Sequence, residues 1–269
     1  MKLAFTTFAC PQWALGRIVA AARAEGYAGI EFRCDADHRH GVEVWASPGD
    51  RQEVRAALEG EGLTPCCLAT SVQCLSQRAT REAQPRIELA AEIGCPAVRV
   101  FCGPAPEHMP ITEVTQRVGE TLAEMALCAD PLNVSVLLET HDTLSRGADA
   151  AAAVRAAGHP AVGINYNNIH PFRRGEDLAA TFAALHGLIR HVHLHDAMNH
   201  AAEVDIRPIG QGQMPMEATF AAVVAEGYQG FISGEWFGRQ YGPDPDAAIA
   251  QFSKEITDLA RRHGVEWAD

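Results

Sequence analysis

The sequence predicts a single (β/α)8 TIM barrel in which residues 1–269 form one domain. Short apolar runs of β type alternate with helix-forming segments eight times along the chain. Successive runs are separated by roughly 30 residues, which is the length that right-handed βαβ crossovers require. No break in composition and no low-complexity linker divides the 269 residues, a length that is usual for one such barrel.

The predicted strands are rich in apolar residues, as buried parallel strands should be. They occupy residues 3–8, 28–33, 64–70, 97–102, 134–140, 162–167, 190–196 and 230–236. The predicted helices occupy residues 15–25, 50–61, 78–93, 111–128, 148–157, 178–188, 214–226 and 246–263. In the second strand, Glu31 and Arg33 share one face. Between the sixth strand and its helix, Pro171 should disfavour further helix or strand at His170.

The seventh predicted strand carries an alternating row of histidines. Val192 and Leu194 share one face, which suits packing against helices, and His191, His193 and His195 share the other. In a closed barrel these imidazoles would point into the interior. Metal coordination is one reason for such a row, and hydrogen bonding to neighbouring groups is the alternative.

Composition excludes several classes of protein. The net charge of −12 argues against nucleic acid as the main partner. There is no apolar run long enough to span a membrane, and the N-terminus reads straight into a strand without a signal-peptide pattern. The eight cysteines form no CxxC pair, so we expect reduced, mostly buried thiols in a cytoplasmic protein. The only lysines, Lys2 and Lys254, are not placed for Schiff-base chemistry at a barrel mouth.

Four polar residues fall at the ends of the last four predicted strands, on the face opposite the bulky aliphatic side chains. They are Glu139, Asn167, His193 and Glu235. Because TIM-barrel active sites lie at the C-terminal ends of the strands, the sequence places these side chains at one rim. Such nitrogen and oxygen donors suit one divalent ion, Mn²⁺, Mg²⁺, Co²⁺ or Zn²⁺. The alternative for the two glutamates is a salt bridge with Arg99 or Arg33.

The same residues carry a resemblance to the sugar phosphate isomerase/epimerase family of xylose-isomerase-like TIM barrels, over nearly the whole chain. The pieces are LLETHD at 137–142, VGINYNNIHPFRRGE at 162–176, RHVHLHD at 190–196, IGQG at 209–212 and GYQGFISGEW at 227–236. None is specific alone, but their order and strand positions together are. The resemblance implies metal ligation by Glu139, Asn167, His193 and Glu235, with the two glutamates doubling as catalytic acid and base. It also implies substrate contacts by His170 and Arg207.

Asn167 departs from the pattern, because the family normally has Asp at this position. An amide oxygen can bind a hard cation but brings no charge. The metal should therefore bind more weakly or be a different ion, or the site has lost it. His170 or His141 could substitute as a ligand. His141 could equally contact substrate or make only a loop hydrogen bond, and the same holds for His170.

The resemblance implies an isomerase or epimerase of carbohydrate metabolism that moves a proton next to the carbonyl of a ketose or hydroxyketone, through an enediolate. A metal-dependent dehydratase of an inosose-type keto-polyol would use the same enolate. A DNA-repair endonuclease is disfavoured, because the strand ends Ala69-Thr70 and Cys102-Gly103 lack the extra histidines of its three-metal cluster. A non-catalytic sugar-binding protein with a degenerate site is the alternative from another class. We expect a small sugar or polyol as partner, and a homo-oligomer is compatible with the sequence.

Overall fold

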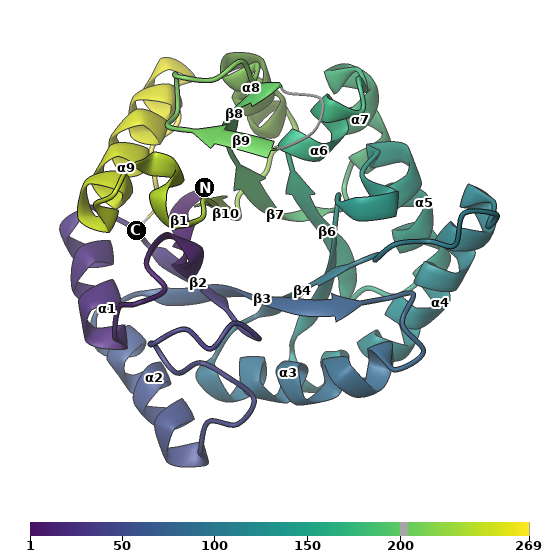
Figure 1. The fold of residues 1–269 in the computed structure, drawn as a ribbon, viewed down its shortest axis with the longest axis horizontal. Helices are drawn as coiled ribbons and strands as arrows, with labels where there is room; N and C mark the ends of the chain where they lie inside the picture. The colour runs from purple at the N-terminus through teal and green to yellow at the C-terminus, as the bar shows by residue number, and fades with distance from the viewer. Residues whose placement is uncertain (200–203, 269) are drawn as a thin grey trace.

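A computed structural model describes residues 1–199 and 204–268. Eight parallel strands form a closed barrel in the order β1-β10-β7-β6-β5-β4-β3-β2, which confirms the predicted (β/α)8 class (Figure 1). The barrel closes where β1 pairs with both β10 and β2, with Lys2 opposite Phe231 and Ala4 opposite Gly29. The barrel strands are β1 Lys2–Thr6, β2 Gly29–Arg33, β3 Thr64–Gln73, β4 Ala97–Phe101, β5 Ser135–Glu139, β6 Val162–Asn167, β7 Ile189–Leu194 and β10 Phe231–Gly234.

Helices surround the strands and cover their outer apolar face (Figure 1). On β6, for example, the Tyr166 ring packs edge-on against Phe182 of α7, with 5.0 Å between centroids. No helix of the described residues is long and apolar enough to cross a membrane. The outer helices are α1 Leu15–Ala24, α2 Pro48–Gly60, α3 Ala79–Ile93, α4 Ile111–Ala129, α5 Gly147–Ala157, α7 Leu178–Leu185, α8 Met216–Ala225 and α9 Pro245–Arg262.

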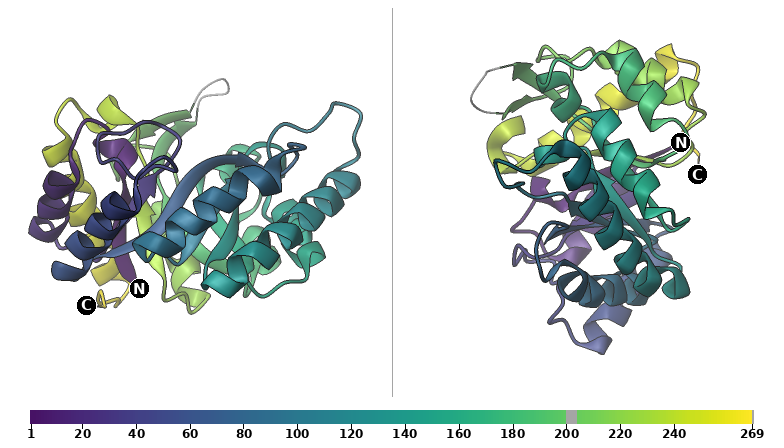
Figure 2. Two further views of the ribbon diagram at one scale, coloured as in Figure 1. Left: turned by 90° about the horizontal axis from the view of Figure 1, so that it is seen from below. Right: turned by 90° about the vertical axis from the view of Figure 1, so that its right-hand side faces the viewer.

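Two short elements at the C-terminal ends of the strands were not expected from the sequence. β8 (Asp196–Asn199) and β9 (Val204–Arg207) form an antiparallel hairpin after β7. Figure 2 shows this hairpin at one end of the barrel and both chain termini at the other. Short 3-10 turns also follow several strands, among them η1 (Thr7–Ala9), η3 (Asp142–Leu144) and η4 (Gly238–Tyr241).

The expectation that Pro171 prevents helix at His170 is wrong. Both residues lie in α6 (Ile169–Arg173), a short helix that follows β6 directly. Pro171 is the third residue of this helix, where a backbone N–H would have no partner within the helix in any case. The proline therefore costs no hydrogen bond, and α6 carries His170 to the mouth of the barrel.

Candidate active site

The four strand-end residues predicted to share one site contact one another in the structure. They come from the neighbouring strands β5, β6 and β7 and from the residue after β10. Asn167 Nδ2 lies 2.7 Å from Glu139 Oε1 and 3.3 Å from Glu235 Oε2. His193 Nδ1 lies 3.3 Å from Glu139 Oε1 and 3.2 Å from Glu235 Oε2. All four side chains are buried, so their charges interact in a medium less polarisable than water.

Glu139 is held as a carboxylate by positive charge on two sides. Arg99 Nε on β4 lies 3.1 Å from Glu139 Oε2, and both side chains are 1% exposed. Burial alone would raise the pKa of Glu139, but Arg99 and His193 lower that pKa to about 2. The salt bridge considered from the sequence is thus present for Glu139 and Arg99. It uses only Oε2, which leaves Oε1 directed at Asn167 and His193. Arg33 instead donates to the carbonyl oxygen of Ala69, at 3.1 Å.

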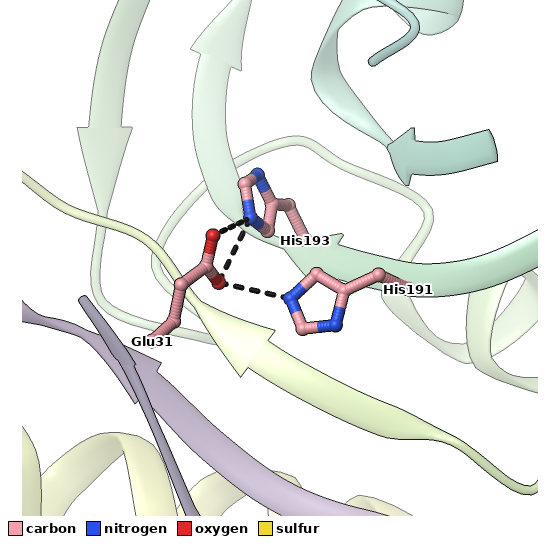
Figure 3. Close-up of side chains that lie close together, drawn as sticks. All are labelled: Glu31, His191 and His193. Atoms are coloured by element: carbon pink, nitrogen blue, oxygen red, sulfur yellow. Dashed lines mark hydrogen bonds and ion pairs between the residues drawn. The ribbon is translucent and has the colours of Figure 1, made fainter. Parts of the chain in front are cut away.

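A carboxylate deeper in the barrel orients His193, and the sequence did not assign it a role. Glu31 of β2 accepts from His193 Nε2 at 2.8 Å and from His191 Nε2 at 2.9 Å (Figure 3). Burial raises the pKa of Glu31, but the two imidazoles lower it well below its usual range. Burial lowers the pKa of His193, yet the surrounding carboxylates raise it well above 6.5. Because Nε2 is hydrogen-bonded to Glu31, His193 presents Nδ1 to Glu139 and Glu235.

The site opens into a cavity of about 200 Å³. His141 and His170, predicted as substrate contacts, both line it, with their ring centroids 4.1 Å apart. Burial lowers the pKa of His141, but its hydrogen bond to Asp142 and the charge of Glu139 raise it overall. Burial lowers the pKa of His170 to about 3, so this imidazole is neutral at physiological pH. Phe237, which is 48% exposed, adds an apolar wall.

Arg207, the third predicted substrate contact, lies on β9 with its side chain 48% exposed. Its guanidinium pairs with Asp205 at 2.6 Å. The neighbours Val204 and Ile206 line the cavity instead. Successive side chains of a strand alternate between faces, so Arg207 and Ile206 point to opposite sides of the hairpin. In this structure the hairpin therefore contributes apolar surface to the cavity rather than a positive charge.

The glycines of the IGQG segment serve a turn rather than a ligand. Asp196 accepts from the backbone N–H of Gly210 at 2.8 Å, Gly212 at 2.9 Å and Met214 at 3.1 Å. A Cβ at Gly212 would lie 2.1 Å from Asp196 Oδ1, so no other residue fits there without movement. The carboxylate of Asp196 thus caps the loop that leads into α8, and its oxygens are taken up by that loop.

Some of the strand-end groups have the spacing of ligands to one divalent cation. Tetrahedral ligands held about 2.1 Å from one ion lie roughly 3.4 Å apart, which is close to the 3.2–3.3 Å from His193 Nδ1 to the two glutamate oxygens. Among the described residues, the ligand atoms of His193, His195 and Glu235 lie close enough to share an ion, whereas Glu139 belongs to no such group. Glu31, His191 and His193 form a second such group, but their atoms already satisfy one another through hydrogen bonds.

Comparisons with known proteins agree with this architecture. The family model for the xylose isomerase-like TIM barrel matches residues 19–266. A solved structure of the IOLI protein with a bound zinc atom superposes with a TM-score of 0.84 at 18% identity, covering 97% of this chain and 99% of that one. The probable 3-DHS dehydratase AsbF from Bacillus anthracis gives 0.78 at 18% identity, covering 96% and 99%. L-ribulose 3-epimerase gives 0.78 at 18% identity, covering 98% and 96%.

No curated protein matches the sequence. The solved structures share too little sequence to carry more than the fold. The family model, by contrast, covers all but the first 18 and last three residues. The chain belongs to the xylose isomerase-like TIM barrel family.

Proposed function

We propose that this protein is a metal-dependent sugar isomerase or epimerase that transfers a proton next to the carbonyl group of a ketose or hydroxyketone. One observation supports this most. Glu139 and Glu235 lie on either side of His193 at the mouth of the barrel, both within 3.3 Å of its Nδ1. Two carboxylates and an imidazole around one point are groups that can bind a cation and move a proton beside it.

In this proposal Glu139, His193 and Glu235 hold the ion, and the resemblance adds Asn167 as the fourth ligand. When bound, a divalent ion would supply Lewis-acid polarisation of the substrate carbonyl, which acidifies the neighbouring C–H. Glu31 keeps His193 Nδ1 facing the site through its contact with Nε2. Arg99 keeps Glu139 ionised and contacts only its Oε2, so that Oε1, which faces the site, can accept a proton or contact a cation.

The proton steps fall to the two glutamates. One removes the α-proton to give the enediolate, and the other returns a proton to the adjacent carbon or to the opposite face. His141 and His170 line the cavity within reach of sugar hydroxyls. The neutral His170 can both donate and accept a hydrogen bond, as a hydroxyl partner requires. The apolar wall that includes Phe237 suits the carbon face of a sugar.

Solvent deuterium exchange tests the proposal. The purified protein, supplied with Mn²⁺, Mg²⁺, Co²⁺ or Zn²⁺, is incubated in D₂O with a panel of ketoses, inososes and hydroxypyruvate. We expect deuterium at the carbon beside the carbonyl of one substrate class, detected by NMR. The products then assign the reaction class: an isomer or epimer supports the proposal, whereas loss of water assigns the dehydratase alternative. No exchange in any member of the panel would favour the sugar-binding alternative.

Substitution of the two carboxylates tests their roles. Glu139→Gln and Glu235→Gln remove the proton-accepting charge while keeping the side-chain shape. We expect each variant to lose exchange by a factor of at least about 100, the size of a general acid-base contribution. Circular dichroism should show that both variants stay folded. Near-normal exchange in both would reject the acid-base assignment.

A further inference from the structure

His195 is a buried histidine whose ring lacks hydrogen bonds. It is 2% exposed, lines the cavity beside the site and belongs to the interior row of histidines, two residues after His193. Neither ring nitrogen has a hydrogen-bond partner among residues 1–199 and 204–268. Nε2 lies 3.2 Å from Glu235 Oε2 without the alignment of a hydrogen bond. Buried polar atoms are nearly always satisfied, so an imidazole in this state is available to a partner other than the described residues.

The backbone of His195 is fixed by one neighbouring side chain. Asn168 accepts from the N–H of His195 at 2.9 Å and donates to its carbonyl oxygen at 2.9 Å. Both Asn168 and His195 are 2% exposed. These two hydrogen bonds hold the backbone of His195 in place directly after β7, although the nitrogens of its ring have no hydrogen bonds to the described residues. The ring is therefore presented by a built support, as ligand side chains are.

Asn167, by contrast, is already committed as a hydrogen-bond donor. Its Oδ1 accepts from the backbone N–H of Ile169 at 3.2 Å, and its Nδ2 donates to Glu139 and Glu235. A backbone N–H can only donate, so it fixes which end of the amide is oxygen. Turning the amide to offer Oδ1 to a cation would set NH₂ against the N–H of Ile169. The position that the resemblance assigns to a ligand oxygen thus presents N–H groups.

We propose that His195 takes the ligand position that Asn167 does not fill, so that the ion is held by His193, His195, Glu235 and Oε1 of Glu139. This inference rests on the proposed metal-dependent function. His193, His195 and Glu235 form a group of described residues close enough to share one ion. Glu139 lies outside that group and is included because its Oε1 is 3.3 Å from His193 Nδ1. His141 and His170, the substitutes considered from the sequence, belong to no such group in the described part of the chain.

The exchange of an oxygen donor for a nitrogen donor changes the preferred metal. Two glutamates, one aspartate and one histidine would give three oxygens and one nitrogen, a set suited to Mg²⁺ or Mn²⁺. With His195 the set becomes two nitrogens and two oxygens, which suits Zn²⁺ or Co²⁺. We therefore expect the protein to bind Zn²⁺ and Co²⁺ far more tightly than Mg²⁺, as measured by isothermal titration of the apoprotein with each ion.

The number of coordinated imidazoles is a direct readout that does not depend on activity. The full-length protein is loaded with one Cu²⁺ per chain and studied by electron spin-echo envelope modulation, which distinguishes one bound imidazole from two. We expect two in the wild type and one in His195→Gln. A double variant, His193→Gln with His195→Gln, identifies any signal from copper bound elsewhere. One imidazole in the wild type would overturn the proposal.

Zinc affinity gives a second measurement. His195→Gln should weaken Zn²⁺ binding by more than about tenfold, since even loss of a group behind a ligand costs that much. His170→Gln is the matched control, because it makes the same change at another cavity-lining histidine, and its Zn²⁺ affinity should stay near that of the wild type. Asn167→Ala should also leave the affinity nearly unchanged. A larger loss in Asn167→Ala than in His195→Gln would contradict the inference.

Failure of this inference and failure of the proposed function give different results. Zinc bound with a single imidazole, together with deuterium exchange into a sugar, would refute the role of His195 and keep the function. Two imidazoles without exchange into any substrate would do the reverse. A wild-type protein that binds none of the ions would refute both.

Discussion

At the scale of single residues, Glu31 decides which nitrogen of His193 faces the site. An imidazole has two nitrogens, and a ligand histidine usually gives the other one to a carboxylate or carbonyl behind it. We predict that Glu31→Gln, which keeps the shape and removes the charge, lowers metal affinity about tenfold or more. The change should be measured by titrating the apoprotein with Zn²⁺.

Glu176→Gln is the control for this substitution. Glu176 is a half-buried glutamate outside the candidate ligand groups of the described residues, and it accepts hydrogen bonds from the backbone N–H of Gly147 at 2.8 Å and from the hydroxyl of Thr181 at 2.9 Å. The Glu176→Gln variant should lose stability but keep the metal affinity of the wild type. Equal affinity losses in both variants would mean that Glu31 acts only through general stability, and the orienting role would be rejected.

The residue scale also shows what a strand pattern can predict. Glu139, Asn167, His193 and Glu235 were found from the sequence because each ends or nearly ends a strand on its inward face, and closure of the barrel then brings them together. Glu31 could not be paired with His193 in the same way, since 162 residues separate them. The only feature of the sequence that pointed to Glu31 was its position on the strand face opposite the apolar residues of the second strand. Pairing across the interior depends on barrel closure and side-chain length, which the pattern of one strand does not contain.

At the scale of elements, the loop between β2 and α2 is held against η1 by a neutral histidine. His40 Nδ1 accepts from the N–H of Val42 at 3.0 Å, and Nε2 lies 3.1 Å from Thr7 Oγ1. Nδ1 therefore has no proton in the folded protein, and Nε2 carries it. Burial, with the nearby His38, lowers the pKa of His40 to about 3. An unfolded chain would have the ordinary histidine pKa of about 6.5.

The sign of the pH dependence follows from these values. Between pH of about 6.5 and 3 the unfolded chain binds a proton at His40 that the folded protein does not, so the free energy of unfolding falls as pH falls. The slope contributed by this residue is at most about 1.4 kcal/mol per pH unit. Urea unfolding between about pH 7 and pH 5, above most carboxylate titration, should reveal the loss of stability.

Two variants isolate His40 in that experiment. His40→Gln should be less stable at neutral pH but should lose the extra slope, because glutamine does not titrate. His186→Gln, at a side chain that is 78% exposed, should keep the wild-type slope. If His40→Gln retains the full slope, another group is responsible and the loop is not sensitive to protonation through His40.

The elements that the sequence missed lie where local rules compete. The strands and helices of the barrel follow from apolar alternation and helix periodicity, and the predicted ranges match them to within a few residues. α6 was missed because Pro171 was treated as a breaker, although a proline in the first turn removes no helical bond. The β8–β9 hairpin was missed because Val204–Arg207 is a four-residue strand, too short for a period to be visible.

At the scale of the whole molecule, closure of the barrel joins the two ends of the chain. β1 pairs with β2 on one side and with β10 on the other, and the second half of the barrel contributes the four strand-end residues of the candidate site. An ion held by Glu139, His193 and Glu235 would link β5, β7 and the end of β10. Metal binding should therefore stabilise the folded barrel as a whole, since the unfolded chain does not keep these groups together.

We predict that Zn²⁺ raises the midpoint of thermal unfolding. Free ion at about a hundred times its dissociation constant adds about 2.7 kcal/mol to the free energy of unfolding. In a chain of this size each kcal/mol raises the midpoint by roughly 2–4 °C, so the expected increase is about 5–10 °C. Differential scanning fluorimetry with and without a chelator measures it. The double variant Glu139→Gln with Glu235→Gln should show no increase. The same rise in that variant would place the ion elsewhere, with the Cys34, Asp35 and Glu43 group as the first alternative site.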